Sequence, residues 1–136
     1  MALALLLAAA ACAPRPSPTP PGGCATLRGE GALQATLFLG RAVAGREPVS
    51  RPEWEAFAAA VVTPRFPDGF TVLEGRGQWR DPATGAVARE DTVVLLVVAS
   101  PGPETLRRLD EIAAEWRRQF RQRSVGIATA PVCAAF

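Results

Sequence analysis

The sequence contains no histidine and no tyrosine, and all 15 of its basic residues are arginine, so lysine is absent too. Without histidine, a Ser-His-Asp or Cys-His catalytic set and every His-based metal site are excluded; without lysine, no internal amine can form a Schiff base. The 13 acidic residues leave a net charge of only +2, which argues against a dedicated nucleic-acid binder. Any chemistry must come from Asp, Glu, Arg, Cys, Ser and Thr, and we expect neither a metal nor a cofactor.

The N-terminal 23 residues have the pattern of an export signal followed by a tether. Residues 1–11 are apolar, too few to span a bilayer, which needs about 20 residues, but enough for a signal-peptide core. Small residues lead directly into Cys12, which resembles the lipobox of bacterial lipoproteins, where this cysteine carries the lipid. Residues 12–23 are rich in proline, as in an extended tether. We therefore predict a lipoprotein of the cell envelope, held at the outer membrane if the organism has two membranes.

Two other interpretations of this N-terminus stay open. No Arg or Lys precedes the apolar run, and Ala9 stands where lipoprotein signals prefer Leu. Ordinary cleavage after Ala13 would give a secreted protein, although Pro14 would then follow the cut. The third possibility is that the segment carries no targeting information.

The cysteine count fits export. Once Cys12 is assigned to lipid, Cys24 and Cys133 remain as a pair, and an oxidising compartment would permit them to form a disulfide. The alternative is two unrelated buried thiols.

Residues 24–136 read as one α+β domain. Alternation and turn signals predict strands at 33–39, 70–79, 87–99 and 124–133. One helix is predicted from the capping box Ser50–Glu53 to the residue before Pro64, and another over 104–122. The order strand, helix, strand, strand, helix, strand is typical of a ferredoxin-like sandwich, an antiparallel-type four-stranded sheet with two helices on one face. The last strand of that fold lies antiparallel beside the first, which would bring Cys24 near Cys133.

The third predicted strand is apolar on both sides. Val93, Leu95 and Val97 point one way, and the alternate residues 94, 96 and 98 point the other way. The helices can cover only one face, so a partner subunit, a folded loop or a ligand must cover the second. Our first expectation is a homodimer formed through this open sheet face.

The second helix carries five Arg and four acidic residues. A solvated surface with internal ion pairs is the expected role for these charges. Contact with anionic lipid is the alternative.

The segment 62–79 reads VTPRFPDGFTVLEGRGQW, preceded by Trp54 and Phe57 and followed by Arg89 and Glu90. These motifs resemble the bacterial family catalogued as domain of unknown function 3574. The resemblance covers about residues 35–136. The family has no established activity, and its members are small and often exported.

A polar cluster is the candidate ligand site. The loop 63–69 contains two prolines and should be rigid, which makes it a firm mount for a charged side chain. In this hypothesis two arginines grip a carboxylate or phosphate, Glu90 accepts a hydrogen bond or acts as a base, and Trp79 forms a wall. The cluster comprises Arg65, Gln78, Trp79, Arg80 and Glu90. The alternative is structural: Arg65 and Glu90 form an ion pair, Trp79 is core, and Gln78 satisfies backbone groups.

Three classes of function remain compatible with the sequence. The first is a non-enzymatic envelope lipoprotein whose domain binds a small ligand or a protein partner. The second is a cofactor-independent enzyme, similar at the level of fold to small monooxygenases and isomerases, with Glu90 or Asp68 as the acid or base in a cavity over the sheet. The third is a purely structural envelope module.

Overall fold

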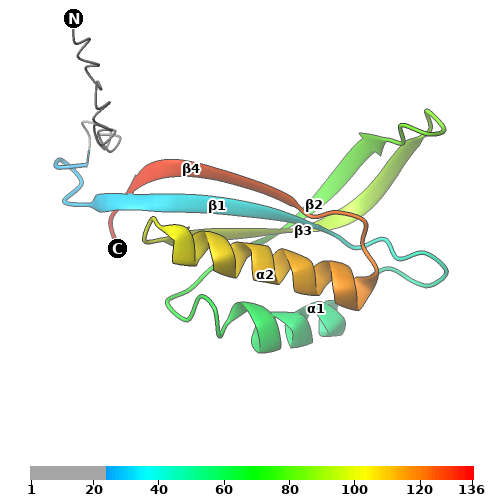
Figure 1. Cartoon of the computed structure of the whole chain (residues 1–136), viewed down its shortest axis with the longest axis horizontal. Coiled ribbons are helices and arrows are strands. Elements are labelled where there is room, and N and C mark those ends of the chain that lie inside the picture. The colour runs from blue at the N-terminus through cyan, green and yellow to red at the C-terminus, as the bar shows by residue number, and fades with distance from the viewer. Residues whose placement is uncertain (1–23) are drawn as a thin grey trace, which may run out of the picture.

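The computed structural model describes residues 24–136, and the predicted signal peptide (1–11), the lipidation site Cys12 and the tether (12–23) lie outside them. The elements follow the predicted order (Figure 1). They are β1 (Glu30–Gly40), α1 (Arg51–Phe57), the π-helical turn η1 (Ala58–Val62), β2 (Thr71–Arg80), β3 (Val87–Ala99), α2 (Pro103–Phe120) and β4 (Gly126–Ala134).

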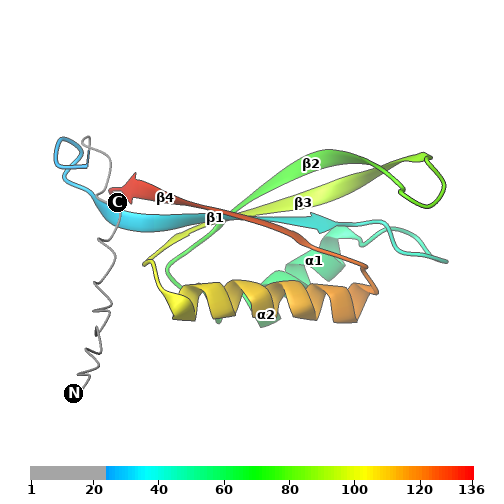
Figure 2. The ribbon, with the colours of Figure 1, turned by 45° about the horizontal axis from the view of Figure 1, so that its top comes forward.

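The four strands form one antiparallel sheet in the order β2-β3-β1-β4. β1 and β4 pair along their length, from Glu30 opposite Ala134 to Phe38 opposite Gly126. Both helices lie on the same side of the sheet (Figure 2). This is the ferredoxin-like α+β fold that the element order predicts.

The first helix begins at the predicted capping box. The Ser50 side chain accepts from the backbone N–H of Glu53, and a Glu53 carboxylate oxygen accepts from the Ser50 N–H at 2.8 Å. The predicted single helix is divided, because the turn after α1 widens: Thr63 donates to the Ala58 carbonyl five residues back, at 2.9 Å.

The core lies between the sheet and the two helices. β1 and β3 contribute alternate residues that are at most 1% exposed: Ala35, Leu37, Leu39, Val93, Leu95 and Val97. Trp116 of α2 is fully buried in an aromatic cluster, with its ring centroid 4.9 Å from that of Phe57 and 4.4 Å from that of Phe120. Its indole Nε1 donates to the Gly40 carbonyl at 3.2 Å, which fixes α2 against the end of β1.

The β2–β3 hairpin continues past the rest of the sheet and bends away from the helices (Figure 2). We call residues 76–91 the arm. Its tip is the predicted turn, where Asp81 Oδ1 accepts from the Ala83 N–H at 2.8 Å and Gly85 adopts a φ of 72°.

Candidate functional site

The sheet face opposite the helices is left uncovered by residues 24–136. Val94, Leu96 and Val98 point to this open face and are partly exposed, so β3 is apolar on both sides as its sequence predicts. Val94 pairs with Phe38 on one side and Leu73 on the other, and these two side chains are 46% and 54% exposed. The open face therefore presents an apolar centre to its surroundings.

A hollow of about 710 Å³ lies at one end of the sheet. It forms where β1 and β2 begin and β3 and β4 end. Leu96 and Val98 supply apolar lining, while Arg28, Asp68 and Ser100 supply polar groups. A volume of this size is within the roughly 300–1,000 Å³ of small-molecule sites, and apolar lining with a few polar groups is their usual composition.

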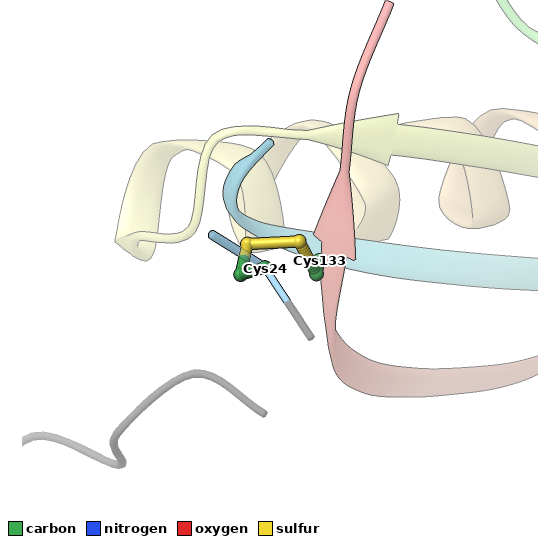
Figure 3. The surroundings of a disulfide bond; sticks show 2 residues. All are labelled: Cys24 and Cys133. Atoms are coloured by element: carbon green, nitrogen blue, oxygen red, sulfur yellow. A yellow bond between two sulfur atoms is a disulfide. The ribbon is translucent and has the colours of Figure 1, made fainter. Parts of the chain in front are cut away.

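The disulfide between Cys24 and Cys133 joins the segment before β1 to the end of β4 (Figure 3). Their Cα atoms are 5.3 Å apart, which confirms the predicted pairing. Residues 28–32, four positions after Cys24, form one wall of the hollow, and residues 134–136, directly after Cys133, form another. The disulfide therefore holds two walls of the hollow together.

Arg65 does not join the predicted cluster, and the expected pair with Glu90 is wrong. Its Nε lies 3.0 Å from Glu111 Oε2 on α2, and one Nη donates to the Val61 carbonyl at 2.8 Å. Arg65 lines a small pocket with Val98, whereas Glu90 lies eight residues earlier on β3, a separation on the order of 25 Å. Arg65 therefore forms an ion pair that ties its loop to α2, as the structural interpretation expects, but the partner is Glu111 and not Glu90.

The other four predicted residues lie on the arm but point to two faces. Gln78 and Arg80 flank Trp79 in one extended strand, so their side chains must leave the side opposite to that of Trp79. Trp79 pairs with Ala88, which puts it on the same side as Glu90. Trp79 is 44% exposed and so is not a core residue. Of the predicted cluster, only Trp79 and Glu90 share the open face.

Glu90 is held where the arm leaves the sheet. Its Oε2 accepts the backbone N–H of Ala42 at 3.3 Å. The carboxylate lies over Gly40: a Cβ at that position would come within 2.6 Å of Oε2. Glu90 is therefore positioned by β1 and its following loop, with acceptor capacity left on the open face.

The hollow is not predicted by any pattern in the sequence. Arg28, Glu30, Thr71 and Ser100 belong to no motif and meet only because four strand ends converge. The sequence suggests Asp68 only as an acid or base, and the structure places it in the lining of the hollow. Within residues 24–136 no group of His, Cys, Asp or Glu has the arrangement needed to hold a metal ion. No helix among these residues is both long and apolar enough to cross a membrane.

The exposed side of α2 carries ion pairs within the helix. Glu104 accepts from Arg107 at 2.7 Å and from Arg108 at 2.9 Å. These side-chain hydrogen bonds lower the pKa of Glu104 from 4.5 to about 2. Glu115 pairs with Arg118, whose hydrogen bond lowers the pKa of that carboxyl. This helix face therefore carries the internal ion pairs that its sequence predicts.

The fold and the open sheet face define a small ferredoxin-like α+β domain. A family model described as "Protein of unknown function (DUF3574)" matches residues 34–136, and the chain belongs to this family. No curated protein matches the sequence.

Two solved structures have a similar fold. Phage SAM lyase in complex with S-methyl-5′-thioadenosine aligns with a TM-score of 0.62 at 14% identity, covering 76% of this chain and 85% of the lyase chain. Phage SAM lyase in the apo state aligns with a TM-score of 0.58 at 18% identity, covering 77% and 86%. At these identities the similarity establishes the fold alone.

Proposed function

We propose that this chain is an envelope lipoprotein whose folded domain binds a small amphipathic molecule in the hollow at the end of the open sheet face. The observation that carries the proposal is the hollow itself, about 710 Å³ of space lined by both apolar and polar groups. Arg28 offers a guanidinium for a carboxylate or phosphate, and Asp68 offers an acceptor for an amine or hydroxyl.

The envelope setting is supported by the cysteines. A disulfide between Cys24 and Cys133 is stable in an oxidising compartment, and Cys12 is left for lipid. Intact-mass spectrometry of the protein extracted from its own membranes tests this setting. A lipid-modified chain that begins at Cys12 is expected, and an unmodified chain with free thiols would contradict it.

Binding can be tested with S-methyl-5′-thioadenosine, the compound held by the phage lyase of similar fold. We expect this probe to raise the melting temperature of the full chain in a concentration-dependent way, because a ligand that binds only the folded state stabilises it. Isothermal titration calorimetry then gives the dissociation constant.

A blocking variant and a matched control localise the binding. Thr71→Trp puts a large side chain into the hollow from the exposed start of β2. Thr129→Trp makes the same change at an exposed position of the other edge strand, outside the hollow. Loss of binding in the first variant alone supports the site. Equal binding by both variants places the probe elsewhere, and no binding by the wild-type chain removes this ligand class.

The enzyme hypothesis is a second candidate, favoured by the similarity of fold to a lyase that acts on a small molecule. Asp68 at the hollow would then act on the substrate rather than only hold it. Incubation of the full chain with SAM, followed by mass spectrometry of the small molecules, separates the two. Depletion of SAM that is lost in Asp68→Asn would establish catalysis, and binding without depletion favours a binding protein.

A further inference from the structure

We propose that a second copy of this chain covers the open sheet face, with the strands of the two copies running in opposite directions, so that Trp79 of each copy forms the lid of the other's hollow. The inference rests on the proposed ligand site, because Trp79 of the partner copy would close the open side of that site.

The centre of the open face is apolar, so a flat apolar surface is the partner that would pack on it. Its most exposed row is Leu73, Val94 and Phe38, and the next row places Leu96 between Thr71 and Thr36. Neither row contains a charged side chain. Apolar patches of this kind are rarely left bare on monomers. The same face of a second copy matches it in shape and in polarity.

The area of the face is near what a stable interface requires. Four strands spaced about 4.8 Å apart, over the eight residue steps from Glu90 to Val98, give roughly 500 Å² in flat projection. Side-chain relief and the arm add to this value. Standard interfaces bury about 800 Å² on each partner, so two such faces with their arms reach that class.

A protruding side chain, Trp79, and the hollow lie at opposite ends of this face. Trp79 lies on the arm and pairs with Ala88, which is six residues before Val94 on β3. Ser100, at the hollow, is six residues after Val94. A two-fold axis that crosses the strands at Val94 therefore carries Trp79 onto the partner's hollow.

The packing of sheets tolerates this arrangement. Sheets stacked face to face cross at about 30°, which over six residues displaces Trp79 sideways by about 10 Å. The hollow is lined from the ends of all four strands, so the displaced indole still meets it. An axis along the strands would instead set Glu90 near Glu90, where two carboxylates repel each other.

The same axis gives Glu90 a partner. Glu90 is four residues before Val94, so the axis places it opposite Val98 of the partner copy, which is four residues after Val94. Val98 pairs with Gln34 of β1. The Gln34 amide can donate to the carboxylate oxygen atoms that the Ala42 N–H leaves available. Trp79 and Glu90 would thus act across the interface, in the lid and in the contact beside it.

Native mass spectrometry of the full chain in mild detergent tests the interface. We expect twice the mass of one chain for the wild type, a single-chain mass for Val94→Glu and for Phe38→Glu, and a retained dimer for Leu106→Glu. Leu106 is the matched control, because it is 50% exposed but lies on α2. Circular dichroism checks the fold of each variant. A wild-type monomer, or a dimer that survives both face variants, overturns the proposal.

A cross-link tests the orientation. Trp79 pairs with Ala88 near the start of β3, and Ser100 follows the end of β3, so the two residues are about 40 Å apart in one chain and a disulfide in Trp79→Cys/Ser100→Cys can form only between copies. We expect a covalent dimer for the double variant and none for either single variant. A covalent dimer with Trp79→Cys alone would show that like ends meet and would overturn the lid. Both measurements are made without ligand, so failure of the probe to bind does not affect them, and a monomer would leave the ligand site testable.

Discussion

The guanidinium of Arg65 and the carboxylate of Glu111 lie 3.0 Å apart and join the loop before β2 to the middle of α2. Both side chains are about one-third exposed, at 29% and 36%. Because Arg65 also donates to the Val61 carbonyl, it fastens the π-helical turn to the same helix. This contact is structural and lies away from the arm.

Replacing Arg65 by Ala should destabilise the domain by about 1–2 kcal/mol, since an ion pair that is about two-thirds buried and a hydrogen bond to the backbone are lost together. Urea denaturation measures the change. Arg51→Ala is the control, because its pair with Glu55 is 83% and 59% exposed and should contribute much less to stability, as surface helix pairs do. Equal losses in the two variants would show that Arg65 has no special anchoring role.

The disulfide should be the largest single contribution to stability. It closes a loop of 109 residues, for which chain entropy predicts up to about 4–5 kcal/mol, with smaller measured values common. We expect Cys24→Ser/Cys133→Ser to lower the free energy of unfolding by about 3 kcal/mol, measured in urea. A further expectation is weaker binding in the hollow, because two of its walls are no longer joined. An unchanged midpoint would contradict the stabilising role.

Two glycines of the same segment should respond in opposite ways to alanine. At Gly29 a Cβ would come within 2.5 Å of the Ala134 backbone oxygen, so the main chain must move. At Gly31 a Cβ meets nothing within 4 Å. Gly29→Ala should therefore cost about 1–3 kcal/mol, whereas Gly31→Ala should be neutral or stabilising by up to about 1 kcal/mol. Melting temperatures of the pair decide the matter, and a tolerated Gly29→Ala would refute the close approach.

The pairing of Glu104 with Arg107 and Arg108 predicts an acid-sensitive contribution to stability. Its pKa is lowered to about 2 in the folded state, so the contribution is fully present above pH 4.5 and is lost as the pH falls toward 2. Glu104→Gln should flatten the stability profile in this window only. In 1 M salt the pKa of Glu104 should rise toward 4.5, because the ion pair is exposed and salt screens it. An NMR titration of the carboxyl carbon measures this pKa. A pKa near 4.5 at low salt would contradict the pairing.

The sequence predicts the architecture because each element carries local signals. β3 is apolar throughout its centre and is bounded by the turn at Gly85 and by Pro101, so its predicted limits of 87 and 99 are correct. The capping box of α1 is equally local. The extra residues of β1, from Glu30 to Ala32, form a strand because β4 pairs with them, and that long-range pairing leaves no local mark.

The candidate site was only partly predictable. Glu111 could not be foreseen as the partner of Arg65, because the fold alone brings these residues, 46 positions apart, together. By contrast, period-two alternation contains the information that separates Trp79 from Gln78 and Arg80. The hollow depends on where several loops end, which no residue pattern encodes.

The position of the Glu90 carboxylate over Gly40 links two residues that are fifty positions apart. A side chain at residue 40 would occupy the space that Oε2 now fills, 2.6 Å away. Homologous chains that keep glutamate at the first of these sites should therefore keep glycine at the second, and the two should be replaced together. Covariation of this pair would show that the contact on the open face has been kept within the family.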